Sequence, residues 1–150
     1  MELSEINHIQ YDHLQQFKPD IFIAASGYES RAAFVTNACR PDAKRHIVFA
    51  FTEHRKDLAR PKNDQFFNNL GYEFIPLSGF STPDYDNLFN NYHGKPLQVM
   101  IDISCMTKKW YYGLLHYLSS ADHFTTVQLI IVYSPSAFDE PLLLKKRVNL

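Results

Sequence analysis

The chain has 150 residues, of which 45% are hydrophobic and 21% charged, and its formal net charge is -1. This length and composition predict one folded domain with its own core, and they exclude two domains of ordinary size. The near-neutral charge excludes a general attraction for extended nucleic acid or for anionic membranes, so that any nucleotide site has to be local.

Short apolar runs alternate with helical patterns along the chain. Residues 1–18 predict a short helix or an arm. The apolar runs predict buried strands at 20–25, 46–51, 72–77, 97–103 and 127–133, with an edge strand at 142–148. Helices are expected between these strands at 29–39, at 63–70 and at 107–119, and a further helix is expected after a cap at Ser81 or Thr82. The segment 52–62 contains Pro61 and is expected to be a loop or a broken helix. This alternation predicts an α/β fold, Rossmann-like, with a mainly parallel sheet of five or six strands and helices on both faces.

The cysteines and the N-terminus indicate the compartment. Cys39 and Cys105 are the only cysteines, which is too few for a disulfide scaffold and fits a reducing environment. The N-terminal residues are polar and lack an apolar signal core, and no apolar run approaches the roughly 18 residues that span a bilayer. We therefore expect a cytoplasmic protein that does not contact membranes.

The loop at 102–109 follows the fourth expected strand and is rich in polar side chains. In an open parallel sheet, ligands bind outside the carboxyl ends of the strands where the strand order reverses. Ser104 and Thr107 offer hydroxyl groups near the N-terminus of a helix, whose free N–H groups attract anions, and Lys108 adds a positive charge. These residues predict a phosphate cradle. The alternative is that Thr107 only caps the helix, that Asp102 binds backbone amides and that Lys108 is solvated.

The loop at 26–31 follows the first expected strand, which we expect to lie beside the fourth at the centre of the sheet. Gly27 permits a tight turn, Ser26 and Ser30 can bind phosphate or sugar, and Arg31 can hold a phosphate bidentately. Tyr28 belongs to the same expected ligand-binding set. Glu29 can accept from a base edge or a ribose or act as a general base, or it can simply complement a helix dipole. Neither G-x-G-x-x-G nor a Walker A sequence is present, which disfavours classical dinucleotide binding and P-loop chemistry.

The second loop resembles the fourth-strand motif of the CRISPR-associated Rossmann-fold (CARF) domains. That motif has Asp or Asn, any residue, Thr or Ser, three more residues and then Lys or Arg, with Thr or Ser often before the basic residue. Asp102, Ser104, Thr107 and Lys108 stand at the matching positions, and 26–31 stands where the family has its other ligand loop. The resemblance implies a homodimer that binds cyclic oligoadenylates across its interface, and in some members degrades them, in prokaryotic antiviral defence.

Two other functions stay open on the sequence alone, so that it does not decide whether the protein is an enzyme. One is a Rossmann-like hydrolase acting on a nucleotide or N-glycosidic bond, with Glu29 or Asp102 as the catalytic carboxylate. The other is a non-catalytic subunit whose Phe- and Tyr-rich faces bind a partner protein. The histidines show no metal-ligand spacing, and we expect neither a metal nor a cofactor. Cys105 is more typical of a small buried cysteine than of a nucleophile.

Overall fold

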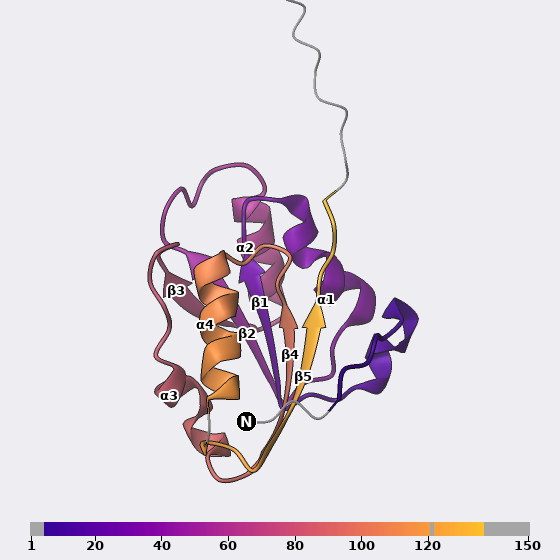
Figure 1. The fold of residues 1–150 in the computed structure, drawn as a ribbon. Helices are drawn as coiled ribbons and strands as arrows, with labels where there is room; N and C mark the ends of the chain where they lie inside the picture. Colours follow the sequence, from indigo (N-terminus) through magenta and orange to yellow (C-terminus); the bar gives the residue numbers. More distant parts are fainter. Residues whose placement is uncertain (1–4, 121, 137–150) are drawn as a thin grey trace, which may run out of the picture.

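The structure is a computed structural model that describes residues 5–120 and 122–136 (Figure 1). Five strands form one all-parallel sheet in the order β3-β2-β1-β4-β5. The strands are β1 (Ile21–Ser26), β2 (Arg45–Phe51), β3 (Glu73–Leu77), β4 (Pro96–Asp102) and β5 (Thr126–Val132). The predicted α/β fold class is confirmed. The edge strand expected at 142–148 lies outside the described residues.

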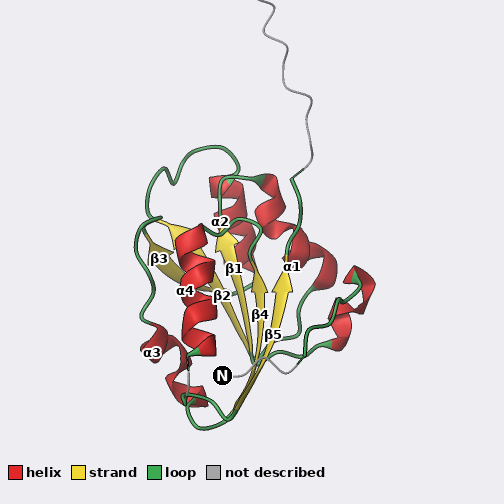
Figure 2. Cartoon of the chain, viewed as in Figure 1, coloured by secondary structure: helices red, strands yellow, loops and turns green. Residues whose placement is uncertain are grey.

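Helices cover both faces of this sheet (Figure 2). The α-helices are α1 (Phe34–Cys39), α2 (Arg60–Asn69), α3 (Tyr85–Phe89) and α4 (Lys108–Ser119), and the 3-10 helices are η1 (Tyr11–Gln16), η2 (Ser30–Ala33) and η3 (Asn90–Tyr92). In Figure 1, α4 lies in front of the sheet and α2 lies behind it. None of the helices in the described part of the chain is long and apolar enough to cross a membrane.

The core is divided by the sheet into two apolar clusters. Alternate residues of β1 face opposite sides, so that Ile21 and Ile23 pack under α3 and α4 while Phe22 packs under α1 and α2. Trp110 of α4 is 0% exposed, and its ring centroid lies 4.3 Å from that of Phe51. Complete burial of such a side chain is worth about 1.5–3 kcal/mol, and burial on both faces explains why the central strands are continuous apolar runs.

The sequence places several element boundaries wrongly, each for a local reason. The segment expected as a loop or broken helix already contains the start of α2 at Arg60, because Pro61 stands in the first helical turn, where its missing N–H is not needed. Asp84, rather than Ser81 or Thr82, caps α3, since its carboxylate accepts from the backbone N–H of Asn87 at 3.1 Å. The helix expected at 29–39 is instead the 3-10 helix η2 followed by the short α1.

The strand order reverses between β1 and β4. Ile21 pairs with Val99, and Ile23 pairs with Ile101. From β1 the chain builds outward through β2 and β3, and it then returns to place β4 and β5 on the other side of β1. The expected adjacency of these two strands is confirmed. The crevice at their carboxyl ends is therefore the place where this fold class binds ligands.

Candidate functional site

The two polar loops at the carboxyl ends of β1 and β4 touch each other. A Cβ atom added to Gly27 would lie 2.9 Å from the Cβ of Cys105, which is closer than such atoms approach in folded proteins. Glycine is therefore needed at position 27 because a neighbouring loop leaves no room for a side chain. The two segments singled out from the sequence are therefore in direct contact.

The buried side chains of Asp102 and Ser104 stabilise the loop after β4. Asp102 is 2% exposed, and its Oδ1 accepts hydrogen bonds from the backbone N–H and the hydroxyl of Ser104. The hydroxyl oxygen of Ser104 in turn accepts from the backbone N–H of Ser134 at 2.8 Å. Burial raises the pKa of Asp102 above its ordinary value, although the two hydrogen bonds from Ser104 oppose this effect. Both side chains are engaged in holding the loops after β4 and β5 together.

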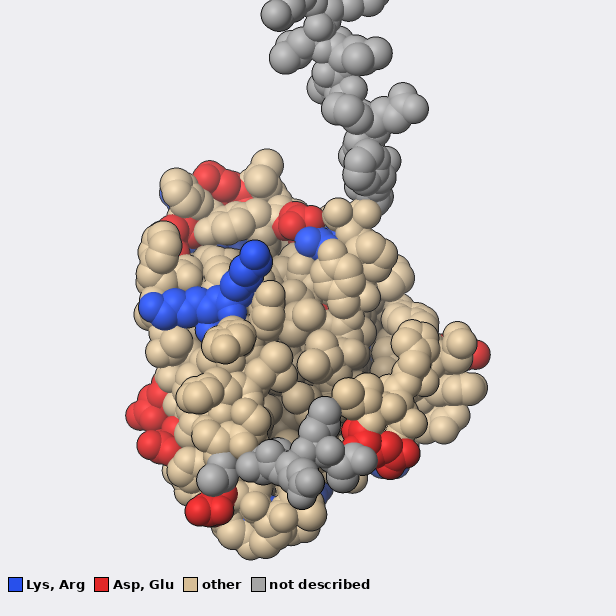
Figure 3. Space-filling model, in the orientation of Figure 1, with Lys and Arg blue, Asp and Glu red and all other residues tan. Residues whose placement is uncertain are grey.

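Thr107, Lys108 and Lys109 stand at the start of α4. The Thr107 hydroxyl caps this helix by accepting from the backbone N–H of Trp110 at 3.3 Å. Both lysines are exposed, and neither forms an ion pair within the described residues. In Figure 3, Lys and Arg side chains gather over this end of α4. Two unpaired cations therefore stand where the helix dipole is positive.

Arg31 is held in one orientation by three groups. Its guanidinium makes a bidentate ion pair with Glu29, with distances of 2.8 Å from Nε to Oε2 and 3.2 Å from Nη2 to Oε1. Its Nη1 donates to the carbonyl oxygen of Ser134 at 2.6 Å, and its Cζ lies 5.5 Å from the ring centroid of Tyr133. The hydrogen bonds to the Glu29 carboxylate raise the pKa of Arg31 above its ordinary value. Ser134 therefore links Arg31 to Ser104 and joins the predicted loops.

Arg31 also lines a cleft of about 750 Å³ bounded by η1, η2, α1, α2 and the segment after β5. Lys62 lines it from α2, and the rings of Tyr11, Phe34 and Tyr133 line it as well. The rings of Tyr11 and Phe34 are stacked with centroids 6.0 Å apart. Small-molecule sites have volumes of about 300–1,000 Å³ and combine apolar walls with a few polar groups. Cations beside exposed aromatic rings suit a ligand with phosphate and base moieties.

The sequence-predicted residues thus lie in several different environments. Ser30 and Arg31 line the cleft, and Lys108 stands on the exposed start of α4, outside the cleft lining. Glu29 is exposed beside Arg31, whereas Ser26, Gly27, Asp102 and Ser104 are buried beneath the loops. Tyr28 is half-buried, with its ring 5.1 Å from that of Phe51 and its hydroxyl donating to the carbonyl of Glu53 at 2.8 Å.

A buried polar network that the sequence analysis missed holds the β1 loop in place. The hydroxyl of Ser26 donates to Oδ1 of Asp64 at 2.6 Å, and Nε of Arg60 donates to the same oxygen at 2.7 Å. The amide of Asn63 donates to the carbonyls of Gly27 and Glu29, at 2.9 Å each. Arg60 and Asp64 are four residues apart, which is a helical spacing, but Pro61 between them favours a loop or a broken helix on the sequence alone.

Cys105 lies in the crevice but is poorly suited to nucleophilic attack. Burial, together with the nearby Glu29 carboxylate, raises the pKa of its thiol to about 12. The thiolate is the reactive form, so at neutral pH this side chain is an inert thiol.

Comparisons of the chain with models of protein families, with curated proteins and with solved structures found no match. A functional assignment therefore depends on the fold and on the side chains that its loops bring together.

Proposed function

We propose that this chain is a CARF-like nucleotide-binding domain that acts in prokaryotic antiviral defence and takes a nucleotide or cyclic oligonucleotide at the carboxyl ends of β1 and β4. The observation that carries the proposal is the cleft beside Arg31, next to the point where the strand order reverses. The cleft combines two cations, Arg31 and Lys62, with exposed aromatic rings. The loop after β4, which carries the resemblance to that family, supports it further.

In this proposal the phosphate groups contact Arg31 in the cleft and Lys108 at the start of α4, outside the cleft lining, and the aromatic rings of the cleft pack on a base. Thr107 supports the first turn of α4, where free backbone N–H groups favour an anion. Ser104 and Asp102 keep the two loops in register without touching the ligand, because both are buried and already hydrogen-bonded. Since the resemblance also implies a homodimer, a second copy of the chain is expected to contribute to the site.

The first test is a thermal-shift screen with mononucleotides, dinucleotides and cyclic oligoadenylates, followed by chromatography of each hit for products. A sensor raises the melting temperature and returns its ligand unchanged, whereas a hydrolase or ring nuclease converts it. If no nucleotide changes the melting temperature at millimolar concentration, the proposal is wrong. Light scattering with and without the best ligand tests the homodimer, which a monomer under both conditions would contradict.

The second test compares neighbouring lysines by titration calorimetry with the best hit. A hydrogen bond to a charged group is worth roughly 1.5–3 kcal/mol, so Lys108→Ala is expected to weaken binding by about tenfold or more. Lys109→Ala is the matched control, because the next residue of a helix points about 100° away. Equal losses from both variants would indicate a diffuse basic surface, and no loss from Lys108→Ala would remove the proposed phosphate contact.

A further inference from the structure

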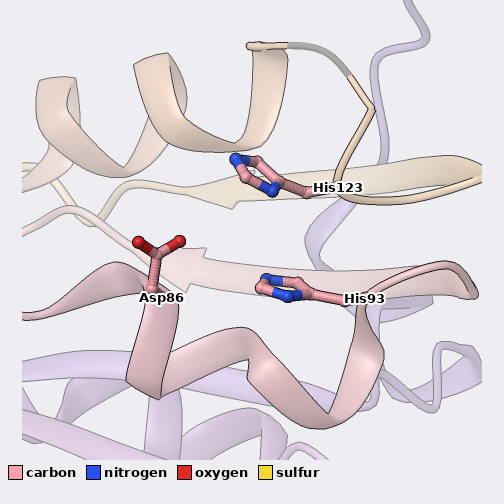
Figure 4. A group of neighbouring side chains, drawn as sticks. All are labelled: Asp86, His93 and His123. Carbon is pink, nitrogen blue, oxygen red and sulfur yellow. The ribbon is translucent and has the colours of Figure 1, made fainter.

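Two histidines and an aspartate meet at the opposite end of the sheet from the crevice. His93 precedes β4, His123 precedes β5, and Asp86 stands in the first turn of α3. One potential ligand atom from each of the three lies within 4.8 Å of the other two. Figure 4 shows Asp86 and His93 on one helical segment and His123 on a separate segment, with the three side chains extending toward a common space.

The backbone holds the two histidines together. The N–H of Gly94 donates to the carbonyl of His123 at 2.7 Å, and the N–H of Thr125 donates to the carbonyl of Lys95 at 3.1 Å. These two hydrogen bonds join the turn before β4 to the turn before β5. The imidazole rings are consequently stacked, with centroids 5.1 Å apart and planes 24° from parallel.

Tyr117 of α4 contacts all three residues of the cluster. Its hydroxyl donates to Oδ1 of Asp86 at 2.7 Å, and its oxygen lies 3.1 Å from Nε2 of His93. Its ring stacks on the imidazole of His123 with centroids 4.9 Å apart. The Phe89 ring also stacks on the Tyr117 ring, with centroids 5.6 Å apart. The phenol therefore orients the Asp86 carboxylate toward the imidazoles.

We propose that Asp86, His93 and His123 bind a divalent transition-metal ion of the Zn²⁺ type, with Tyr117 as a positioning residue. Two imidazoles and one carboxylate are a donor set that suits zinc and its neighbours in the first transition row. Mg²⁺ and Ca²⁺ prefer oxygen ligands, of which this cluster offers too few.

Ion binding requires a small contraction of the cluster. Tetrahedral ligands about 2.1 Å from zinc lie about 3.4 Å from one another. The ligand atoms lie within 4.8 Å of one another, so a pair at that limit has to close by about 1.4 Å. We expect rotation of the side chains to achieve this contraction while the paired turns stay fixed. Three protein ligands leave a fourth position for water, and Asp86 is exposed to solvent. The ion would join α3 to the turns before β4 and β5.

The test is calorimetric titration of zinc sulfate into the full chain, purified without a histidine tag and freed of metal with a chelator. We expect one zinc ion per chain, no binding of Mg²⁺ under the same conditions, and an affinity at least about tenfold lower in His93→Ala and in His123→Ala, because even changes behind the ligands cost 10–100-fold. His116→Ala is the matched control, since His116 is an exposed histidine of α4 outside the cluster.

Two further variants separate a metal site from a hydrogen-bonded cluster without a metal. Tyr117→Phe keeps the ring and removes only the hydroxyl, so it is expected to weaken zinc binding by about 10–100-fold while circular dichroism shows a folded chain. The double variant His93→Ala, His123→Ala is expected to abolish binding. The proposal is overturned if the wild type does not bind zinc, or if this double variant binds zinc as tightly as the wild type. Neither result bears on nucleotide binding, which is proposed at the other end of the strands.

Discussion

The buried ion pair beneath the β1 loop gives the sharpest stability prediction. Arg60 is 1% exposed, and its Nε donates to the Asp64 oxygen that also accepts from Ser26. Its Nη1 is buried without a hydrogen-bond partner among the described residues, so Asp64 is the main group that compensates its charge. Replacing Asp64 by Ala leaves the guanidinium buried without that carboxylate, which costs about 3–5 kcal/mol.

The reverse change is expected to be milder. Arg60→Met leaves Asp64 with the hydrogen bond from Ser26 and with a side chain that is 19% exposed to water. We expect a loss of about 1–3 kcal/mol, in the range for a hydrogen bond to a charged group. In the double variant no charge is left uncompensated, so it is expected to be more stable than Asp64→Ala alone by at least about 1 kcal/mol.

Urea unfolding measures all three variants. Trp110 is the only tryptophan of the chain and is completely buried, so its fluorescence reports on the loss of the core, and far-UV circular dichroism is the second probe. The reasoning is refuted if Asp64→Ala loses less than about 1 kcal/mol at an unchanged m-value. It is equally refuted if the two single losses simply add in the double variant, because coupled charges do not behave additively.

Three further predictions concern the crevice. Gly27→Ala is expected to cost about 1–3 kcal/mol in urea unfolding because the new Cβ meets Cys105, and adding Cys105→Gly should restore part of this loss; no loss in the single variant would contradict the close approach of the loops. Burial raises the pKa of Asp102, so folding favours the protonated carboxyl group. The contribution of Asp102 to stability is therefore complete below its pKa in the unfolded chain and is lost as the pH rises through its pKa in the folded chain. As the pH rises from 4 to neutrality, the melting temperature of Asp102→Asn is therefore expected to rise relative to that of the wild type. A difference in melting temperature that shifts in favour of the wild type over this range would contradict the reasoning. Cys105, whose pKa is raised to about 12, is expected to react with iodoacetamide at pH 7.5 far more slowly in the folded chain than in urea, and mass spectrometry showing equal rates would exclude an inert thiol.

The sheet could be predicted because its cause is local. A strand buried on both faces must be apolar at almost every position. β1 and residues 99–101 of β4 are short runs of this kind, and helical patterns separate these strands from their neighbours. Such alternation leads to parallel pairing, and parallel strands bring their carboxyl ends to one edge. The two polar loops could therefore be placed together without knowing any side-chain contact.

The partners of the polar side chains could not be predicted, because they come from distant parts of the chain. Ser26 and Asp64 are 38 residues apart, and Ser104 and the backbone N–H of Ser134 are 30 residues apart. Similarly, the spacing of His93 and His123 gives no metal signal, and only the pairing of the turns before β4 and β5 brings them together. Spacing along the chain indicates which groups share an element, whereas tertiary packing decides which of them compensate one another.

The free-energy cost of breaking the present hydrogen bonds decides whether Arg31 or Ser104 can contact an anion. The carboxylate of Glu29 is 52% exposed, and an exposed ion pair contributes only about 0–1 kcal/mol. A phosphate can therefore replace Glu29 at the guanidinium at little cost, while Ser134 keeps Arg31 in place through a separate hydrogen bond. Releasing the hydroxyl of Ser104 would instead leave the buried N–H of Ser134 unpaired, at a cost of about 1–3 kcal/mol. If the proposed nucleotide binding holds, this arrangement favours Arg31 over Ser104 as the anion contact, with Glu29 holding the guanidinium in position in the absence of ligand.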